Sequence, residues 1–223
     1  VAGLRRAQLR RPLIELDGLF RFAPKVCDVG QVVGPPGGEA SAARPDRQLD
    51  CLSDYSDLIP GTLEVVAALR ARGIKIGSTT GYLREMMEIN LRDAKKQGYE
   101  PDSTVCASDV PAGRPYPYMC LQNVINLQVS PVEACVKIDD TIPGIEEGLN
   151  AGMWTIGLAV SGNEVGLSLK EWKALPEPER MARSQRAYDR MRQGGAHYVA
   201  DTIADILPCI DAIDARLAQG EKP

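Results

Sequence analysis

The fold of this chain is decided by residues 135–160, which read CVKIDDTIPGIEEGLNAGMWTIGLAV. Two apolar runs, 135–138 and 154–160, have the composition of buried strands, and between them lies a helical pattern at 142–151. A strand, a crossover helix and a second strand of these lengths form a parallel β-α-β unit. Residues 135–160 therefore predict one part of a parallel sheet.

The same alternation of helix and strand continues on both sides of that unit. Upstream, helices are predicted at about 62–72, 83–97 and 116–127, and strands at 74–78 and 105–106. Downstream, a long charged helical stretch is predicted at 167–193, then a strand at 197–199 and a closing helix at 202–217. The whole pattern predicts an α/β fold of the Rossmann-like kind, a parallel sheet with helices on both faces.

Composition narrows the class of protein. The chain has 223 residues, of which 44% are hydrophobic, enough to bury a core of one α/β domain with at most a small appendage. Its net charge is −4 and it has no basic stripe, which argues against nucleic acid or an anionic membrane as a partner. No apolar run reaches membrane-spanning length. We expect a cytoplasmic protein that acts on a small soluble molecule.

The cysteines and the single histidine exclude some kinds of site. Six cysteines show no C-x-x-C spacing and stand mostly in apolar patterns, so we expect reduced, buried thiols. His197 is the only histidine, which excludes a zinc site built on several histidines. It stands in a short strand pattern, and we expect a structural role for it.

Composition changes near residue 50. Residues 30–48 are rich in Gly, Pro, Ala and Ser and contain almost no core-forming side chains, which predicts a flexible segment. We therefore divide the chain into an atypical, partly flexible N-terminal segment, 1–50, and an α/β core, 51–223.

Hydroxyl groups and an arginine follow two of the predicted strands. In the run STTG, residues 78–81, the Thr80 hydroxyl and the backbone N–H groups near Gly81 can hold an anion. The simpler interpretation is that a Thr before a helix only caps it. Arg114 lies in a loop between glycine and proline, where a guanidinium can bind a phosphoryl oxygen. An ordinary surface arginine is the alternative.

Two carboxylates, Asp139 and Asp140, directly follow the strand at 135–138. Two acids at one strand end repel each other unless a cation or a hydrogen-bond network offsets the repulsion, and Mg²⁺ is the natural cation for oxygen ligands. One of them could instead cap the helix at 142–151. Hydroxyl, arginine and diacid in this order predict a phosphate and magnesium site at the carboxyl edge of the sheet.

That order resembles motifs two, three and four of the haloacid dehalogenase-like hydrolase superfamily. Within this superfamily, the sequence of the chain is similar to those of the phosphonoacetaldehyde hydrolases, also called phosphonatases. The matching runs are CLSDYSDLIPG at 51–61, GIKIGSTTGY at 73–82, DVPAGRPYP at 109–117, GLNAGMWTIG at 148–157 and SGNEVGL at 161–167. The resemblance covers about residue 51 to the C-terminus and rests on long literal runs.

The resemblance implies hydrolysis of the carbon–phosphorus bond of phosphonoacetaldehyde, a small phosphonate, to acetaldehyde and phosphate with Mg²⁺. In the family, a core aspartate attacks phosphorus, and a lysine of a helical cap forms a Schiff base with the aldehyde. Carried over, Thr80 and Gly81 are phosphoryl contacts and Arg114 stabilises charge. Asp140 is the Mg²⁺ ligand, supported by Asp139. Family members pair as homodimers through the cap, which leaves the assembly of this chain open.

The first third of the chain departs from the family pattern. The family's first strand ends in Asp-Trp-Ala-Gly-Thr, and the closest string here is LIELDGL at 13–19. There Glu15 would replace the nucleophile and Asp17 is a further candidate metal ligand, with chance similarity in an amphipathic strand as the alternative. The helical cap is largely missing, and Lys25, the only lysine before Lys75, matches no lysine motif of the family. We therefore expect little turnover.

Two other functions stay open. A phosphomonoesterase of the same superfamily could use Asp17 as its general acid. A non-catalytic remnant of a phosphonatase would bind phosphate or Mg²⁺ weakly and turn over nothing. The abrupt change in composition near residue 50 favours the remnant over the esterase.

Overall fold

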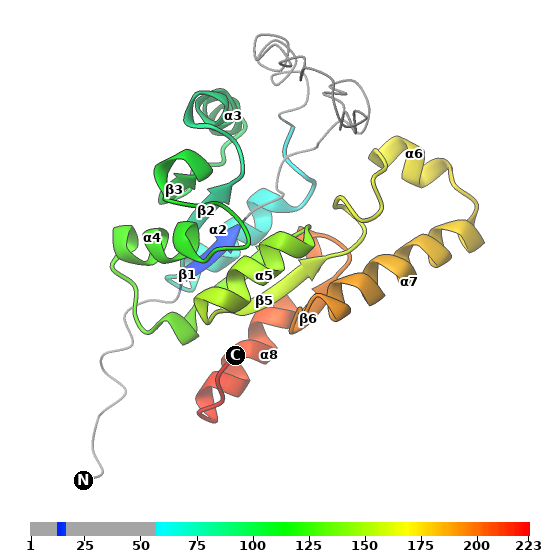
Figure 1. Cartoon of the computed structure of the whole chain (residues 1–223). Coiled ribbons are helices and arrows are strands. Elements are labelled where there is room, and N and C mark those ends of the chain that lie inside the picture. The colour runs from blue at the N-terminus through cyan, green and yellow to red at the C-terminus, as the bar shows by residue number, and fades with distance from the viewer. Residues whose placement is uncertain (1–12, 17–56) are drawn as a thin grey trace, which may run out of the picture.

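The computed structural model describes residues 13–16 and 57–223, which are built around one parallel sheet (Figure 1). Within this part of the chain the sheet has six strands, in the order β3-β2-β1-β4-β5-β6. All five neighbouring pairs are parallel. The strands are β1 Leu13–Leu16, β2 Lys75–Thr80, β3 Ser103–Cys106, β4 Val136–Asp139, β5 Trp154–Leu158 and β6 Tyr198–Ala200. The strand order reverses direction at the neighbours β1 and β4, which is where open α/β sheets form a crevice.

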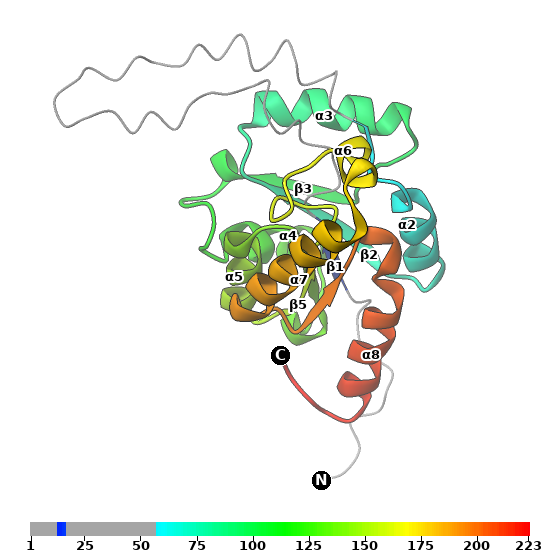
Figure 2. The same ribbon diagram turned by 90° about the vertical axis from the view of Figure 1, so that its right-hand side faces the viewer.

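Helices lie on both faces of this sheet. The helices are α2 Thr62–Ala71, α3 Arg84–Lys96, α4 Tyr118–Leu127, α5 Ile142–Ala151, α6 Leu169–Ala174, α7 Glu177–Gln193 and α8 Leu207–Ala218. Figure 2 shows α2 and α8 on one side of the sheet and α4, α5 and α7 on the other. This confirms the predicted Rossmann-like α/β fold.

The main apolar core lies between the sheet and the helices α2 and α8. It contains Ile76, Ile138 and Ile156 from the strands, packed with Leu69 of α2 and Ile213 of α8. All five side chains are almost fully buried, and burial of apolar area is the main term that stabilises the fold. Because side chains alternate along a strand, the neighbours of Ile138 in β4 face the opposite helix layer.

Several predicted elements have the bounds that the structure shows, and α5 has both ends in the predicted places. The prediction of one helical stretch at 167–193 is wrong, since α6 and α7 are separate helices. Leu175 and Pro176 between them are extended, and for Leu175 the reason is that a proline ring disfavours the helical conformation in the residue before it. The closing helix begins later than predicted, at Leu207, after a short 3₁₀ helix at Ile203–Asp205.

The central strand β1 comes from the part of the sequence before residue 50. Glu15 is in register with Gly77 of β2 on one side and with Lys137 of β4 on the other. A first strand of the family pattern would take the same central position, and the role of Glu15 stays a prediction. The division of the chain at residue 50 stays a prediction, although the sheet takes its central strand from before that point.

The cysteines and the histidine of the described ranges have structural surroundings. Cys106, Cys120 and Cys135 are free and buried, as predicted, and Cys209 is free and half-buried, while Cys27 and Cys51 lie outside those ranges. His197 precedes β6. Its Nδ1 accepts a hydrogen bond from the Thr155 backbone N–H at 3.1 Å, and its ring meets the Trp154 ring edge-on. These contacts support a structural role. None of the helices in 13–16 and 57–223 has the length and apolar character needed to cross a membrane.

Candidate active site

The side chains singled out in the sequence meet at the carboxyl edge of the sheet. Thr80 is the last residue of β2 and Asp139 the last residue of β4, with Asp140 directly after it. Arg114 enters from the loop between β3 and α4, and its Nη2 lies 3.6 Å from Asp139 Oδ2 and 3.5 Å from the Thr79 carbonyl oxygen. The structure therefore brings hydroxyl, arginine and diacid together at one edge.

Asp139 is held firmly in place. Its Oδ1 accepts hydrogen bonds from the Thr141 backbone N–H at 2.9 Å and from the Thr141 hydroxyl at 2.7 Å. Its Oδ2 lies 3.3 Å from Lys137 Nζ and faces Arg114. Burial raises the pKa of Asp139, but the two cations and the Thr141 hydrogen bonds lower it by more. The pKa of Asp139 therefore lies below its usual range, and the carboxyl stays ionised.

Thr141, rather than an aspartate, caps α5. The Thr141 hydroxyl accepts a hydrogen bond from the Gly144 backbone N–H at 3.2 Å, so the alternative that Asp139 or Asp140 serves as the helix cap is wrong. Gly144 also lets α5 come close to the strand end, because a Cβ there would lie 2.0 Å from Asp139 Cγ. The first turn of α5 is thus built around the Asp139 carboxylate.

Asp140 has a different environment from its neighbour. It is 5% exposed, and its Oδ2 accepts a hydrogen bond from the Asn163 backbone N–H at 3.0 Å. Burial and the negative charge of Asp139 raise the pKa of Asp140 to about 6. Gly162 allows the loop after β5 to approach, since a Cβ there would lie 2.4 Å from Asp140 Cβ.

These two environments decide which carboxylate suits a metal ion. Asp139 already faces two cations, whereas no ion pair within the described ranges neutralises Asp140. A hard cation such as Mg²⁺ at Asp140 would supply that missing charge, so Asp140 fits as a carboxylate ligand. The described residues contain no group of three or more His, Cys, Asp or Glu side chains placed to hold a metal. Further ligands would therefore be water, backbone oxygens or residues outside those ranges.

Behind Arg114 lies a buried ionic cluster that the sequence interpretation missed. Lys137 of β4 and Glu147 of α5 expose no side-chain area, and Lys137 Nζ lies 3.1 Å from Glu147 Oε2. The same oxygen lies 3.3 Å from Arg114 Nε, and the Lys137 ammonium donates a hydrogen bond to the Thr79 hydroxyl. Burial alone would lower the pKa of Lys137, but Glu147 and Asp139 raise it above its usual range, so the ammonium is held charged.

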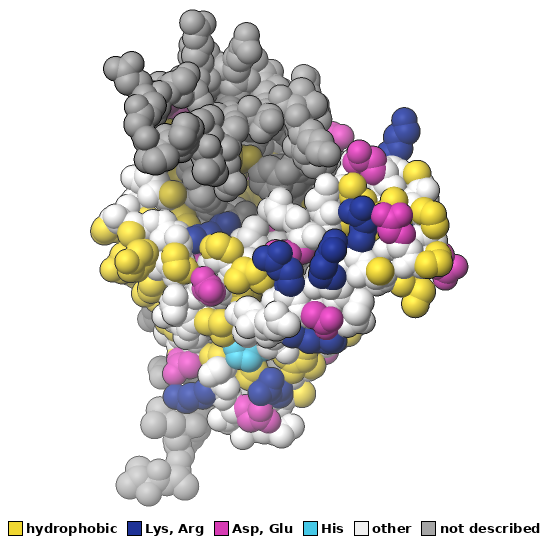
Figure 3. All heavy atoms as spheres, turned by 45° about the vertical axis from the view of Figure 1, so that its right-hand side comes forward, with side chains coloured by type: hydrophobic (Ala, Val, Ile, Leu, Met, Phe, Trp, Pro, Cys, Tyr) yellow, Lys and Arg dark blue, Asp and Glu magenta, His cyan; other side chains and the backbone are white. Residues whose placement is uncertain are grey.

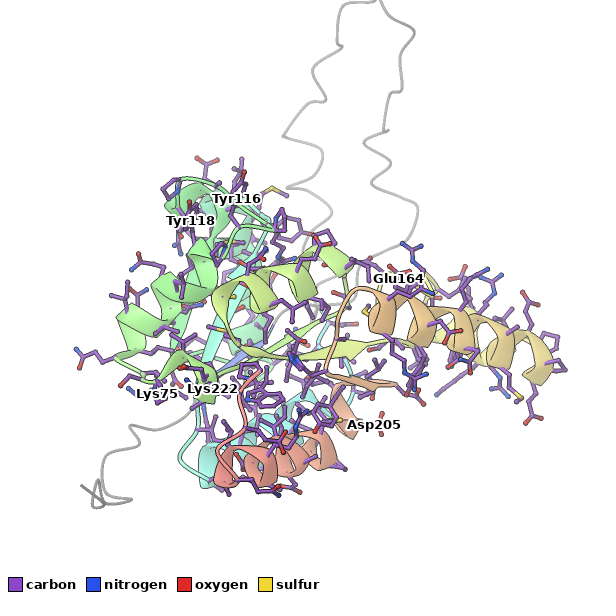
Figure 4. All side chains as sticks on the ribbon, turned by 60° about the horizontal axis from the view of Figure 1, so that its bottom comes forward. Lys75, Tyr116, Tyr118, Glu164, Asp205 and Lys222 are labelled. Atoms are coloured by element: carbon purple, nitrogen blue, oxygen red, sulfur yellow. The ribbon has the colours of Figure 1, made fainter. Side chains whose placement is uncertain are left out.

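The same carboxylates act on Arg114. Burial lowers the pKa of Arg114, whereas Asp139 and Glu147 raise it by more. The guanidinium therefore stays charged although only 17% of its side chain is exposed to water. Its loop is fastened to α5, because the Asn150 side chain donates a hydrogen bond to the Pro115 carbonyl at 2.8 Å. Figure 4 shows Tyr116 and Tyr118 next to each other in the same region, and their rings stack with centroids 5.8 Å apart.

The predicted hydroxyl and glycine lie at the strand end, but not at a helix start. Helix α3 begins only at Arg84, with Leu83 before it, so the interpretation of Thr80 as a helix cap is wrong. The Thr80 hydroxyl instead accepts a hydrogen bond from the Tyr82 backbone N–H at 3.2 Å. Apart from the chain neighbours of Gly81, no heavy atom of the described residues lies within 4 Å of where a Cβ of Gly81 would be.

Three further candidates come from the first third of the chain. The backbone of Glu15 lies in β1, level with Gly77 and Lys137. Asp17 and Lys25 lie outside the described residues.

A sequence signal for the missed cluster existed. Lys137 is a charge inside an apolar strand, which is unusual unless a partner is buried with it. Gly144 and Gly148 stand four apart on α5 and so share a face, and Glu147 is next to that face. In the structure a Cβ at Gly148 would lie 2.6 Å from Lys137 Cβ, which shows how closely the helix covers the strand.

Charge on the outer surface is mixed in sign. On the face shown in Figure 3, basic side chains lie among acidic ones over the described residues. Arg190 of α7, for example, pairs with Glu164 at 2.9 Å, and Arg183 pairs with Glu179 at 2.9 Å. The described part of this face carries no continuous basic surface.

Comparison with known proteins gives consistent relatives. A family model described as haloacid dehalogenase-like hydrolase matches residues 31–152. A phosphonoacetaldehyde hydrolase of Hahella chejuensis is 48% identical over 176 residues, which is 79% of this chain and 60% of the relative. One of Aeromonas hydrophila is 51% identical over 177 residues, 79% of this chain and 63% of the relative.

A longer match and a solved structure agree with these. A phosphonoacetaldehyde hydrolase-like protein of Syntrophobacter fumaroxidans is 48% identical over 197 residues, 86% of this chain and 71% of the relative. The crystal structure of a phosphonoacetaldehyde hydrolase-like protein from Oleispira antarctica has a TM-score of 0.78 and 50% identity, covering 79% of this chain and 64% of that one. The chain thus spans 60–71% of the length of the three sequence relatives.

Proposed function

We propose that this chain, which belongs to the haloacid dehalogenase-like hydrolases and among them to the phosphonoacetaldehyde hydrolase family, cleaves the carbon–phosphorus bond of phosphonoacetaldehyde. Water is consumed, and acetaldehyde and phosphate are the products. The observation that carries the proposal is the position of Arg114, a charged guanidinium between Thr79 and Asp139 at the carboxyl edge where β2 ends with Thr80 and Asp140 follows β4.

Binding of the phosphoryl group falls to the end of β2 and to Arg114. No described residue crowds the side of Gly81 where a Cβ would lie, and backbone N–H groups there and the Thr80 hydroxyl can donate to phosphoryl oxygens. Arg114 can offset the negative charge that grows on these oxygens as the nucleophile attacks. Because Asp139 and Glu147 already hold the guanidinium, little reorientation is needed when substrate arrives.

For the metal, we assign Asp140 as the carboxylate ligand of Mg²⁺, with Asp139 supporting it from the neighbouring position. A bound Mg²⁺ would withdraw negative charge from the phosphoryl oxygens. Asp139 contributes by holding Arg114 and the first turn of α5, through its contacts with Thr141.

The nucleophile is assigned to Glu15, whose place in the central strand matches the family's first motif. Attack of its carboxylate on phosphorus forms an acyl phosphate and breaks the carbon–phosphorus bond. The electron pair goes to carbon, which takes up a proton to become acetaldehyde, and water then hydrolyses the acyl phosphate. In the family a lysine imine accepts that electron pair.

Lys137, the buried lysine of this site, does not fit that role. An imine forms from a neutral amine, whereas Lys137 is fully buried and held charged by Glu147 and Asp139. Lys25, outside the described ranges, is the remaining candidate for the imine, and it matches no lysine motif of the family. Accordingly we expect turnover well below ordinary enzyme rates.

The experiment is a coupled acetaldehyde-release assay on the purified full chain with Mg²⁺ and phosphonoacetaldehyde. Release above the protein-free rate but well below ordinary enzyme rates, and its loss in Arg114→Ala, are the expected results. A borohydride-trapped adduct on Lys25 would mean that the first third of the chain rebuilds the site. Arg192→Ala, an exposed residue of α7, is the matched control and retains release. If the chain releases no acetaldehyde and borohydride traps no adduct, the proposal is contradicted and a phosphate-binding remnant is the remaining interpretation.

One observation favours a second candidate, a phosphomonoesterase. Glu15 and Asp17 stand two residues apart at the end of the central strand, and esterase chemistry needs no imine-forming lysine. Hydrolysis of p-nitrophenyl phosphate that Asp17→Asn abolishes, without acetaldehyde release from the phosphonate, would replace the first proposal by this one.

Location and assembly are proposals of the same kind. A small phosphonate substrate calls for no nucleic-acid or membrane partner, and we place the protein in the cytoplasm. Whether it pairs as a homodimer, as the family does, is measured by light scattering on the eluting full chain.

A further inference from the structure

Glu147 is an acid inside the molecule whose role goes beyond the assignments above. It lies on α5 with no exposed side-chain area. Its Oε2 lies 3.1 Å from Lys137 Nζ and 3.3 Å from Arg114 Nε. A single carboxylate oxygen thus joins a buried lysine of β4 to the arginine of the proposed phosphoryl site.

The contact with Arg114 is on the Nε side of the guanidinium. Nη2 of the same group lies near the Thr79 carbonyl oxygen and Asp139 Oδ2. The guanidinium is planar and rigid, so fixing Nε and Nη2 at separate points fixes its plane and its direction. Glu147 supplies one of those two points.

Stability alone does not account for this arrangement. Taking charges out of water costs more than a single ion pair returns, and apolar side chains of similar volume usually replace buried pairs without loss of stability. Moreover, Glu147 Oε1 has no hydrogen-bond partner among the described residues. A carboxylate with one oxygen unpaired contributes little to stability, but its other oxygen is enough to hold a neighbouring cation.

We propose that Glu147 is a positioning residue, which aligns Arg114 for phosphoryl binding while Lys137 holds Glu147 in place. This inference rests on the proposed function only in that Arg114 binds a phosphoryl group. It also predicts that Arg114→Lys weakens phosphate binding, since an ammonium offers no separate Nε and Nη2 to fix.

The test measures binding of inorganic phosphate to the full chain by calorimetry, with Mg²⁺ present. A negative charge near an anion site weakens binding, so Glu147→Gln should strengthen it if Glu147 acts only through its charge. A positioning role gives the opposite sign, and we expect binding weaker by roughly tenfold, since a misplacement of about 1 Å can cost up to about a hundredfold.

Two further variants separate positioning from folding. Glu147→Asp keeps the charge but shortens the side chain, so positioning predicts weaker binding there too. In an Arg114→Lys background, where Nε is gone, Glu147→Gln should change phosphate affinity by less than about twofold, because coupled residues are not additive. Glu146→Gln, the exposed neighbour on α5, is the control and leaves the affinity unchanged.

Equal or tighter phosphate binding by Glu147→Gln overturns the inference, as do additive effects in the double variant or no phosphate binding by the unmodified chain. Failure of the proposed function looks different. A chain that binds phosphate through Arg114 and Glu147 but releases no acetaldehyde refutes the cleavage of phosphonoacetaldehyde and leaves the positioning role standing.

Discussion

The two faces of strand β4 are equally buried and chemically opposite. Val136 and Ile138 point into the apolar core under α2 and α8. Lys137 and Asp139 point to the α5 side, where each is 0% exposed and paired with opposite charge. The first face stabilises the fold by removing apolar area from water, whereas the second tolerates charge because every ion has a partner. Burial by itself therefore says little about what a residue does.

The largest loss of stability is expected when one ion of the charged face is removed. In Lys137→Met, Asp139 and Glu147 lose the cation between them, and Arg114 is left as the one cation for two buried carboxylates, which is costly. We expect the free energy of unfolding to fall by about 3–5 kcal/mol. Urea unfolding followed by circular dichroism measures it, and a loss under about 1 kcal/mol would show that the two faces respond alike.

A steric change at the same face should have a smaller effect. In Gly144→Ala the new Cβ would lie 2.0 Å from Asp139, so the carboxylate or the first turn of α5 must move. Overpacking of this kind costs about 1–3 kcal/mol. In Gly81→Ala the new Cβ meets no atom of the described residues within 4 Å, so this variant is the matched control for stability. Equal unfolding midpoints for the two variants would contradict the close approach.

The apolar face should lose stability without losing binding. Ile138→Val removes one methylene from the core, which typically costs about 0.5–1.5 kcal/mol. Since Ile138 faces away from Arg114 and Asp139, phosphate affinity measured by calorimetry should stay the same. A clear change in affinity would mean that the two faces of β4 are coupled.

The smallest effect concerns a neutral polar group, His197. Burial, and then the charge of Arg216, lower the pKa of His197, and its Nδ1 accepts the Thr155 N–H only while unprotonated. The folded state thus favours neutral histidine, and the unfolded chain binds a proton near pH 6.5. Stability from His197 is therefore complete above that pH and is lost as the pH falls towards its folded pKa.

Unfolding midpoints of the unmodified chain and of His197→Gln test this. The advantage of the unmodified chain should be larger at pH 7.5 than at pH 5.5, and the difference between the two proteins removes the contribution of all other groups. A difference that stays constant with pH would contradict the neutral state of His197.

The elements of the sheet follow from local patterns. Helix α5 could be predicted to the residue because its start, its glycine end and its apolar face all lie within the helix itself. The break at Pro176 was also readable, from the restriction that proline places on the residue before it. Strand β1 was harder, because four residues carry too weak a pattern, and only pairing on both sides makes them the central strand.

The site divides in the same way. Arg114, Thr80, Asp139 and Asp140 could be singled out from the sequence, because their chemistry and their places after strands are visible there. Which aspartate faces the cations was not visible. That depends on how α5 packs on β4. Only this packing brings Glu147 next to Lys137, ten residues earlier in the chain, and next to Arg114, 33 residues earlier.

The sequence by itself determined the α/β class, the order of the strands along the chain and the residue types at the carboxyl edge, because these follow from periodicity and turn chemistry. Only the tertiary structure decided that Asp139 is neutralised, that Asp140 is left with a pKa raised to about 6 and that Glu147 holds Arg114. The physical reason is that a charge in a low-dielectric interior is governed by the neighbours within a few ångströms of it, and folding brings those neighbours from distant parts of the chain.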